Sequence, residues 1–283
     1  MSRQDEKRRL PVVLTIAGSD SGGGAGIQAD LRTFHALGVY GCSAVTAVTA
    51  QNPREVRRVD VLPAEAVRAQ LESVLDVMPV GAAKSGMLAA APIIETVAAV
   101  VRERCLPLVL DPVMVATSGA CLLPRDAVDA MTEHLLPLAR WITPNVPEAE
   151  LLCGRRVTGS REMGEAALEL HRRYGCGVIL KGGHLLGEER ASDVVCIGGE
   201  LFSLSSPLVP EAASASHGTG CTLSAALAAR LAQGRCWQDA VISAKAFVYS
   251  SLKERVCLSD SLCQMFPPDE MDSAAVELTE ASW

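Results

Sequence analysis

Short apolar runs alternate with longer amphipathic segments along most of this chain. The strand-like runs are residues 11–17, 40–50, 80–84, 106–110, 141–143 and 177–180. The segments with helical spacing are 27–37, 63–78, 92–104, 124–134, 147–152, 160–174 and 237–252, and Ser160 is the expected cap of its helix. Runs 193–197 and 200–204 flank two glycines and predict a β-hairpin. Strands alternating with helices predict an α/β fold with a parallel sheet.

A glycine-broken turn, Ser216 to Cys221, runs directly into an apolar helix that covers Thr222 to Ala229. Such a junction directs backbone N–H groups and the positive end of the helix dipole at one point, which suits an anion. A thiol at a helix N-terminus also loses its proton more easily. We therefore expect an anion site here, with Cys221 as the most readily ionised of the ten cysteines. The alternative is a tight turn in which Cys221 is a small buried residue.

Polar side chains follow several of the predicted strands. Gln51 follows one run, Asp111 another, and Lys181 precedes two glycines. Ligands of open α/β sheets bind at the carboxyl ends of the strands, so these residues are candidate ligands. The alternatives are a turn residue for Gln51 and an ordinary surface lysine for Lys181.

The glycine-rich loop of residues 18–26 follows the first predicted strand. It fits a loose dinucleotide fingerprint, but the acidic residue expected about twenty positions later is missing. A P-loop is excluded because the chain has no Gly-Lys-Ser/Thr. The glycines indicate a backbone that lies close to a small ligand. The alternative is that they only allow the loop to form tight turns.

Composition narrows the class of protein. The 283 residues are 49% hydrophobic and carry a net charge of −7 without a basic stripe, which argues against nucleic-acid binding. No apolar run is long enough to cross a bilayer, and the charged N-terminus does not read as a signal peptide. Ten scattered cysteines without a CxxC pair indicate reduced thiols and a cytoplasmic protein. We expect one domain over 1–283, with a core at about 11–255 and loose tails at 1–10 and 256–283.

Seven motifs resemble, in order, those of the hydroxymethylpyrimidine/phosphomethylpyrimidine kinases of thiamine biosynthesis. They cover about Val12 to Leu252. The motifs are Thr15 to Leu31, Thr49 to Asn52, Lys84 to Leu88, Leu110 to Met114, Thr143 to Ala149, Leu180 to His184 and His217 to Thr222. Two departures are Ser85, where an apolar residue is common, and Ala215-Ser216, where an Asn/Asp-Thr pair is common.

The resemblance implies a ribokinase-like three-layer α/β/α sandwich with a mainly parallel central sheet, usually as a homodimer. It implies ATP and Mg²⁺ as cofactors. The implied reaction phosphorylates 4-amino-5-hydroxymethyl-2-methylpyrimidine and then its monophosphate to the diphosphate. A pyridoxal or pyridoxine kinase of the same fold is the alternative. A non-catalytic pyrimidine-binding regulator would have a damaged anion turn or no lysine, and both features are intact here.

The resemblance also implies roles for individual residues. The catalytic set is Cys221 as the proton acceptor with Gly218, Thr219 and Gly220 as the anion hole. The substrate-binding set is Gly18, Asp30, Gln51, Met87 and Val113, with Asp30 and Gln51 on the aminopyrimidine edge. The ATP-binding set is Lys181, Asn145 and Thr219. The metal-binding set is Asp111, Asn145 and Glu148, partly through water.

Overall fold

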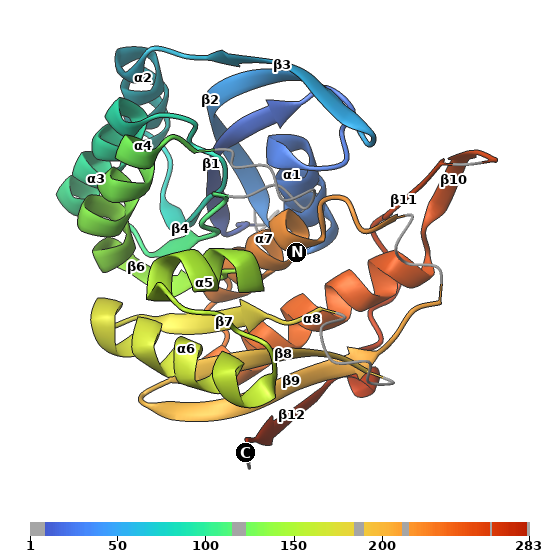
Figure 1. The fold of residues 1–283 in the computed structure, drawn as a ribbon. Helices are drawn as coiled ribbons and strands as arrows, with labels where there is room; N and C mark the ends of the chain where they lie inside the picture. Colours follow the sequence, from blue (N-terminus) through green and yellow to red (C-terminus); the bar gives the residue numbers. More distant parts are fainter. Residues whose placement is uncertain (1–8, 115–122, 184–189, 211–214, 261, 282–283) are drawn as a thin grey trace, which may run out of the picture.

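A ten-stranded sheet runs through the computed structural model, which describes residues 9–114, 123–183, 190–210, 215–260 and 262–281 (Figure 1). Its strand order is β12-β9-β8-β7-β6-β5-β4-β1-β2-β3. The strands are β1 (Val12–Asp20), β2 (Tyr40–Asn52), β3 (Glu55–Val61), β4 (Val80–Ser85), β5 (Leu108–Leu110), β6 (Ala139–Ile142), β7 (Gly177–Lys181), β8 (Arg190–Ile197), β9 (Glu200–Pro207) and β12 (Glu277–Glu280). A separate two-stranded sheet consists of β10 (Val256–Ser259) and β11 (Leu262–Gln264).

The central part of the large sheet is parallel. Strands β7, β6, β5, β4, β1 and β2 pair in parallel, while β3 at one edge and β8, β9 and β12 at the other are antiparallel. The predicted α/β fold with a mainly parallel sheet is therefore confirmed, and so is the hairpin of β8 and β9.

Helices cover both faces of the sheet (Figure 1). One face carries α2 (Ala64–Leu75), α3 (Ala91–Arg104), α4 (Arg125–Ala130), α5 (Val146–Cys153) and α6 (Ser160–Tyr174). The other carries α1 (Gly26–Ala36), α7 (Thr219–Ala232) and α8 (Trp237–Lys253). Each layer has its own apolar cluster against the sheet, so the molecule has three layers.

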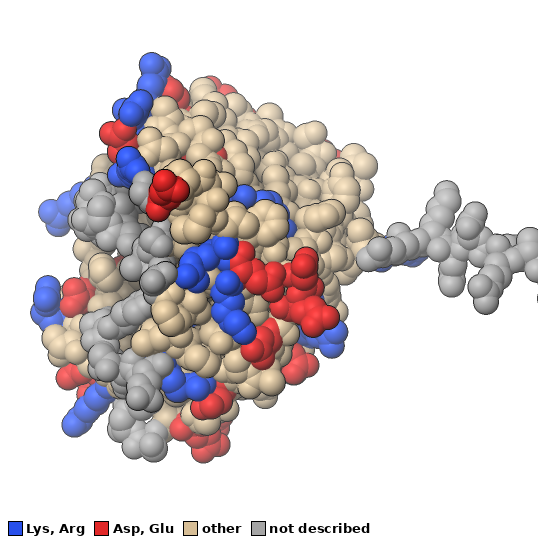
Figure 2. All heavy atoms as spheres, turned by 90° about the vertical axis from the view of Figure 1, so that its right-hand side faces the viewer, with Lys and Arg blue, Asp and Glu red and all other residues tan. Residues whose placement is uncertain are grey.

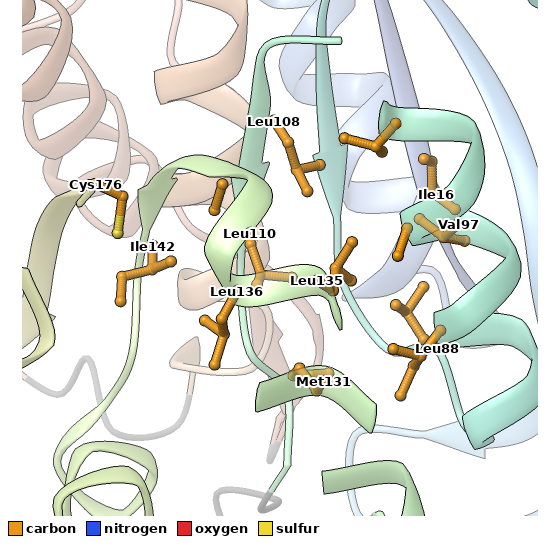
Figure 3. Close-up of a cluster of buried hydrophobic side chains, with 14 of the residues drawn as sticks. Ile16, Leu88, Val97, Leu108, Leu110, Met131, Leu135, Leu136, Ile142 and Cys176 are labelled. Atoms are coloured by element: carbon orange, nitrogen blue, oxygen red, sulfur yellow. The ribbon is translucent and has the colours of Figure 1, made fainter. Parts of the chain in front are cut away.

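Side chains of neighbouring residues in the buried strands pack against helices on opposite faces of the sheet. Leu14 belongs to the cluster under α2 and α3, whereas Val13 belongs to the cluster under α1 and α7. Leu108 and Leu110 face the first cluster, shown in Figure 3, and Val109 faces the second. Side chains of a strand alternate between the faces, so a strand covered on both sides must be apolar throughout. This explains the unbroken apolar runs in the sequence.

The edge strand β3 was not predicted from the sequence. β2 was expected to end at Ala50, but it continues to Asn52 and turns into β3. Every residue of β3 is exposed, so its pattern of apolar and polar residues carries no burial signal. Gln51 thus lies in a strand pair and not in a turn.

Two helix predictions also need correction. The segment expected as one helix over 124–134 ends its α-helical part at Ala130, and a π-helical turn (η1, Met131–Leu135) and a 3₁₀ turn (η2, Leu136–Leu138) follow. Pro137 in the last turn has no N–H to continue an α-helix. Ser160 is not the cap of α6, because Gly159 takes that position without a side-chain hydrogen bond.

The C-terminal segment is not the loose tail expected from its composition. β12 pairs with β9 and supplies hydrogen-bond partners to that edge of the large sheet. Before it, β10 and β11 form a hairpin that extends from the body of the molecule (Figure 1). A disulfide joins Cys257 and Cys263 across this hairpin, so the expectation of reduced thiols is wrong for these two residues. Their cross-strand pairing comes from tertiary structure, which their spacing did not reveal.

Both signs of charge occur on the face drawn in Figure 2, where a group of Asp and Glu side chains lies beside Lys and Arg side chains. Among the described residues, no helix is both long and apolar enough to span a membrane.

The contact between Trp141 and Gly177 on neighbouring strands generates a stability prediction. A Cβ atom at Gly177 would lie 2.6 Å from Cδ2 of the buried indole ring. Gly177→Ala should therefore lower the free energy of unfolding by about 1–3 kcal/mol, because an overpacked core must shift. Gly81→Ala is the matched control: its Cβ would meet Ala232 at an ordinary 3.6 Å, and the change should stay within about 1 kcal/mol. Urea unfolding measures both, and equal values for the two variants would contradict the prediction.

Candidate active site

The carboxyl ends of the parallel strands and the start of α7 meet at one edge of the sheet. Lys181 ends β7 and Asp111 follows β5, and their Nζ and Oδ1 atoms are 2.8 Å apart. A Cβ atom at Gly220 would lie 3.1 Å from Lys181 Nζ and 3.5 Å from Asp111 Oδ2. The glycine turn of α7 therefore lies directly against this ion pair. Lys181 is not an ordinary surface lysine, because its side chain is largely buried. Burial tends to lower its pKa, but the charges of Asp111 and Glu148 and the hydrogen bond to Asp111 together raise it.

Glycines allow close backbone contacts between the glycine-rich loop after β1 and the turn before α7. Gly218 has φ +86° and caps α7, and a Cβ atom on it would overlap the carbonyl oxygen of Gly24. Gly26 has φ +57°, and its Cβ would overlap the carbonyl oxygen of Gly18. Only glycine combines this conformation with such contacts. The N-terminus of α7 is thereby joined to the glycine-rich loop after β1.

The start of α7 has the geometry of an anion site. Thr219 is the first helical residue, and its Oγ1 donates to Ser216 O at 3.0 Å. The first turn of a helix presents backbone N–H groups that lack intrahelical acceptors. Gly220 and Cys221 belong to this turn, next to Lys181. The structure thus brings together the predicted anion hole and the predicted phosphate-binding lysine.

Cys221 does not show the easy ionisation expected from its place in the helix. Its pKa is raised above the usual value, chiefly by burial of the thiol, although the residue as a whole keeps some exposure. Lys84 and the Gly26 N–H lower the pKa, while the charges of Asp30 and Asp111 raise it. The helix-terminus argument alone was wrong, because it ignored burial and two nearby carboxylates.

Asp30 forms a fully buried ion pair with Lys84. Its carboxylate accepts from Lys84 Nζ at 2.9 and 3.1 Å and from Thr15 Oγ1 at 2.5 Å. Burial tends to lower the pKa of Lys84, but Asp30 outweighs it and the pKa is raised. The expected direct contact of Asp30 with a pyrimidine does not fit this arrangement, because its oxygens are occupied and the side chain has no exposed surface. Lys84 was missed as a site residue although its motif was recognised.

Gln51 is joined to two residues that sequence reasoning had not assigned to the site. Its Nε2 lies 3.3 Å from His217 Nε2, and that nitrogen lies 3.2 Å from Asp20 Oδ2. Burial raises the pKa of Asp20, but hydrogen bonds from His217, Ala25 and Gly22 outweigh it and the pKa is lowered. Asp20 and His217 both stand in recognised motifs, yet their contact spans 197 positions and left no signal in the sequence.

Gly18 lies against the side chain of Met87. Their contact is compatible with the prediction that both residues line the substrate pocket. A Cβ at Gly18 would be 2.6 Å from Met87 Cε, so a larger residue would push the methionine away. Val113 is half-buried and follows Asp111, to whose carbonyl its N–H donates at 2.8 Å. Its place in the apolar wall stays a prediction.

The proposed metal ligands are only partly open to a metal. Asn145 and Glu148 form a capping box at the start of α5, in which each side chain accepts from the other's backbone N–H at 2.8 Å. Burial, opposed by Lys181, raises the pKa of Glu148 to about 7. The described residues contain no group of three or more His, Cys, Asp or Glu arranged to hold a metal. Asp111 Oδ1 already accepts from Lys181 Nζ at 2.8 Å and from Thr143 Oγ1 at 3.1 Å, and Mg²⁺ prefers oxygen ligands and keeps several waters. The metal-binding roles of Asp111, Asn145 and Glu148 stay a prediction.

The buried pair of Asp30 and Lys84 should make a measurable contribution to stability. Lys84→Met leaves the Asp30 carboxylate buried without its partner, and should lower the free energy of unfolding by about 3–5 kcal/mol. The double variant Lys84→Met/Asp30→Asn should recover part of this loss, since no unpaired charge is left. Urea denaturation measures the three proteins. A loss below about 1 kcal/mol for Lys84→Met would show that the pair carries little energy.

The raised pKa of Cys221 predicts slow alkylation in the free protein. A thiol whose pKa is raised stays protonated at neutral pH, so its reactivity should rise as the pH increases into the alkaline range. Brief iodoacetamide pulses at about pH 7 and about pH 10, followed by peptide mass spectrometry, test this. Exposed Cys236 should be labelled before Cys221 at the lower pH. Preferential labelling of Cys221 at neutral pH would refute the expectation.

Comparison with known proteins agrees with this geometry. A family model described as phosphomethylpyrimidine kinase matches residues 20–264. A hydroxymethylpyrimidine/phosphomethylpyrimidine kinase of Rhizobium meliloti is 48% identical over 242 residues, which cover 85% of this chain and 90% of the relative.

Solved structures give the same result for the fold. The ADP complex of Bacillus subtilis pyridoxal kinase matches with a TM-score of 0.84 and 38% identity, covering 91% of this chain and 97% of that one. Phosphomethylpyrimidine kinase of Clostridium difficile 630 matches with a TM-score of 0.75 and 38% identity, covering 84% and 97%. The fold is therefore ribokinase-like, and the chain belongs to the phosphomethylpyrimidine kinase family.

Proposed function

We propose that this protein transfers a phosphoryl group from ATP to 4-amino-5-hydroxymethyl-2-methylpyrimidine, and then to the monophosphate, in thiamine biosynthesis. The observation that carries the proposal is the glycine turn of α7 placed against the Lys181–Asp111 pair. Phosphoryl transfer needs positioning and neutralisation of charge more than covalent chemistry. Backbone N–H groups, a helix N-terminus and a lysine at one point supply that neutralisation.

Lys181 is the residue that meets the transferred phosphate. Its ammonium group is paired with Asp111 in the free protein, so it is held in place before ATP arrives. A phosphate oxygen bound at the turn of Gly218, Thr219 and Gly220 would lie within the reach of this ammonium group. Asn145, whose backbone bridges to Lys181 at the neighbouring strand end, adds to the ATP-binding set.

Asp111 is the direct ligand that we propose for Mg²⁺. Glu148 and Asn145 hold one another and would act on the metal through water. When bound, Mg²⁺ neutralises phosphate charge. It would also offset the Asp111 carboxylate, one of the groups that raise the pKa of Cys221.

Cys221 accepts the proton of the attacking hydroxymethyl group in this proposal. Only the thiolate can do so, and the charge of Lys84 and the Gly26 N–H both favour it. Lys84 therefore favours the thiolate, whereas the charge of Asp30 opposes it and Asp30 would act by holding Lys84 in place. Gln51, Gly18, Met87 and Val113 would hold the pyrimidine ring.

Pyridoxal is the second candidate substrate, because the structural relative from Bacillus subtilis is named a pyridoxal kinase. Both molecules are hydroxymethyl heteroaromatics. The intact lysine and anion turn do not support a non-catalytic regulator. A homodimer, which rests on the family resemblance alone, and a cytoplasmic location, which rests on the scattered cysteines, are also part of the proposal.

Turnover tests the proposal directly. The protein, the pyrimidine alcohol and MgATP are incubated, and mass spectrometry follows the mono- and diphosphate, with pyridoxal assayed in parallel. Cys221→Ala should reduce turnover by about 10²- to 10⁴-fold, the usual value of general-base assistance. Cys236→Ala is the matched control, since this exposed thiol also stands at a helix start, that of α8, but follows the C-terminal end of α7, whereas Cys221 lies in its first turn. Absence of both products with the wild-type protein would refute the function, and full activity of Cys221→Ala would refute the role of the thiol.

A further inference from the structure

The side-chain amide of Gln51 is held at both of its polar ends. Its Oε1 lies 3.2 Å from Thr49 Oγ1, and its Nε2 lies 3.3 Å from His217 Nε2. Turning the amide by a half rotation about its last bond exchanges oxygen and nitrogen and leaves these contacts in place. The partners therefore decide which end is the donor.

On one side, Thr49 can only accept from Gln51. Its Oγ1 lies 2.9 Å from the carbonyl oxygen of Ser19, which has no proton to give. A hydroxyl group has a single proton, and here it is donated to Ser19. The Gln51 atom that faces Thr49 must then be the NH₂ group.

On the other side, His217 can only donate. Its Nε2 lies 3.2 Å from Asp20 Oδ2, and a carboxylate accepts only. Asp20 is fixed, because Gly22 N–H and Ala25 N–H donate to its two oxygens at 2.8 Å each. The proton of His217 is therefore on Nε2. Its single N–H is directed at Asp20 Oδ2 and can reach the Gln51 atom 3.3 Å away only as a shared, three-centre bond. That Gln51 atom must then be the carbonyl oxygen, because an NH₂ group there would face another N–H donor.

This orientation of the amide satisfies all four groups at once. A primary amide has two N–H donors and two acceptor positions on oxygen. Thr49 uses one donor and His217 uses one acceptor. One N–H and one acceptor position, on the nitrogen and the oxygen that share Cδ, are left for a ligand.

We propose that His217, held by Asp20, is a specificity-determining positioning residue, which with Thr49 orients the Gln51 amide for an aminopyrimidine. The inference rests on the proposed function and deepens it. An aminopyrimidine carries an exocyclic N–H donor next to a ring-nitrogen acceptor, the complement of the free donor and acceptor of Gln51. A hydroxymethyl pyridine such as pyridoxal has no amino group beside its ring nitrogen. The oriented amide therefore favours the pyrimidine, whereas a freely rotating amide would adapt to either ring.

Two variants of His217 test this with kcat and KM for both substrates. His217→Phe keeps a ring next to Gly24 but removes the donor, and kcat/KM for the pyrimidine alcohol should fall roughly 10- to 100-fold, mainly through KM. The kcat/KM for pyridoxal should change less than about 3-fold. The preference of the enzyme for the pyrimidine should therefore fall nearly as much as kcat/KM for the pyrimidine falls. His217→Gln places an amide N–H near the same position and should recover most of the loss. An equal fall for both substrates, or a fall in kcat alone, would show that His217 only supports the adjacent glycine turn and would overturn the proposal.

Thr49 provides an independent test on β2, away from α7. Thr49→Val removes the acceptor with little change of shape and should reduce pyrimidine affinity roughly 5- to 50-fold without a comparable effect on pyridoxal. Thr49→Ser keeps the hydroxyl group and should recover most of that affinity. Thermal unfolding of each variant shows that it is folded before its affinity is used.

Calorimetric titration without ATP separates the two proposals. If the wild-type protein binds the pyrimidine alcohol but does not phosphorylate it, the proposed function fails, and the affinity ratios of the variants still decide the inference. If the protein turns over the pyrimidine while His217→Phe and Thr49→Val keep the wild-type preference, the inference fails and the function stands. If the pyrimidine alcohol does not bind at all, both are wrong.

Discussion

The close approach of the Gly24 carbonyl to Gly218 is the contact on which the arrangement of the site depends. It joins the loop after β1 to the N-cap residue of α7, two segments almost two hundred positions apart. With this contact in place, the N-terminus of α7 points at the carboxyl ends of the parallel strands. The anion hole, the thiol and the lysine then share one small volume. A side chain at Gly218 would collide with the Gly24 carbonyl, and one at Gly24 would collide with the His217 and Gln264 side chains.

Pairs of buried opposite charges lie at this edge of the sheet. Lys84 and Asp30 are fully buried and interact electrostatically with Cys221. Lys181 and Asp111 lie against the glycine turn. A third pair, Lys245 and Asp193, lies 2.7 Å apart, and Asp193 also accepts from Gly182 N–H, directly after Lys181. Removing one member of such a pair is costly because it leaves a charge without water or partner. The pairs therefore hold the strand ends and helices in defined positions while keeping the site close to neutral.

In the proposed reaction, the two sides of the site would bind different parts of the substrates. The side with Lys181 and Asp111 would bind phosphate, through backbone N–H groups and an ammonium ion. The side with Gln51, His217 and Asp20 would bind the ring, through donors and acceptors of fixed direction. His217 links the two sides, because it contacts Gln51 and Asp20 and precedes the glycine turn in the chain.

The sequence by itself determined the layered α/β fold and pointed to candidate residues at the ends of its strands. Strands buried on both faces must be apolar throughout, and polar residues or glycines must then follow them, so Gln51, Asp111, Lys181 and Cys221 could be found from local pattern and motif order. Tertiary structure alone decided what these residues contact. The roles of Asp30, Lys84 and His217, the raised pKa of Cys221, and the ordered C-terminal strand all arise from groups distant in the chain. Desolvation and charge pairing act through space, and neither leaves a periodic signal in the sequence.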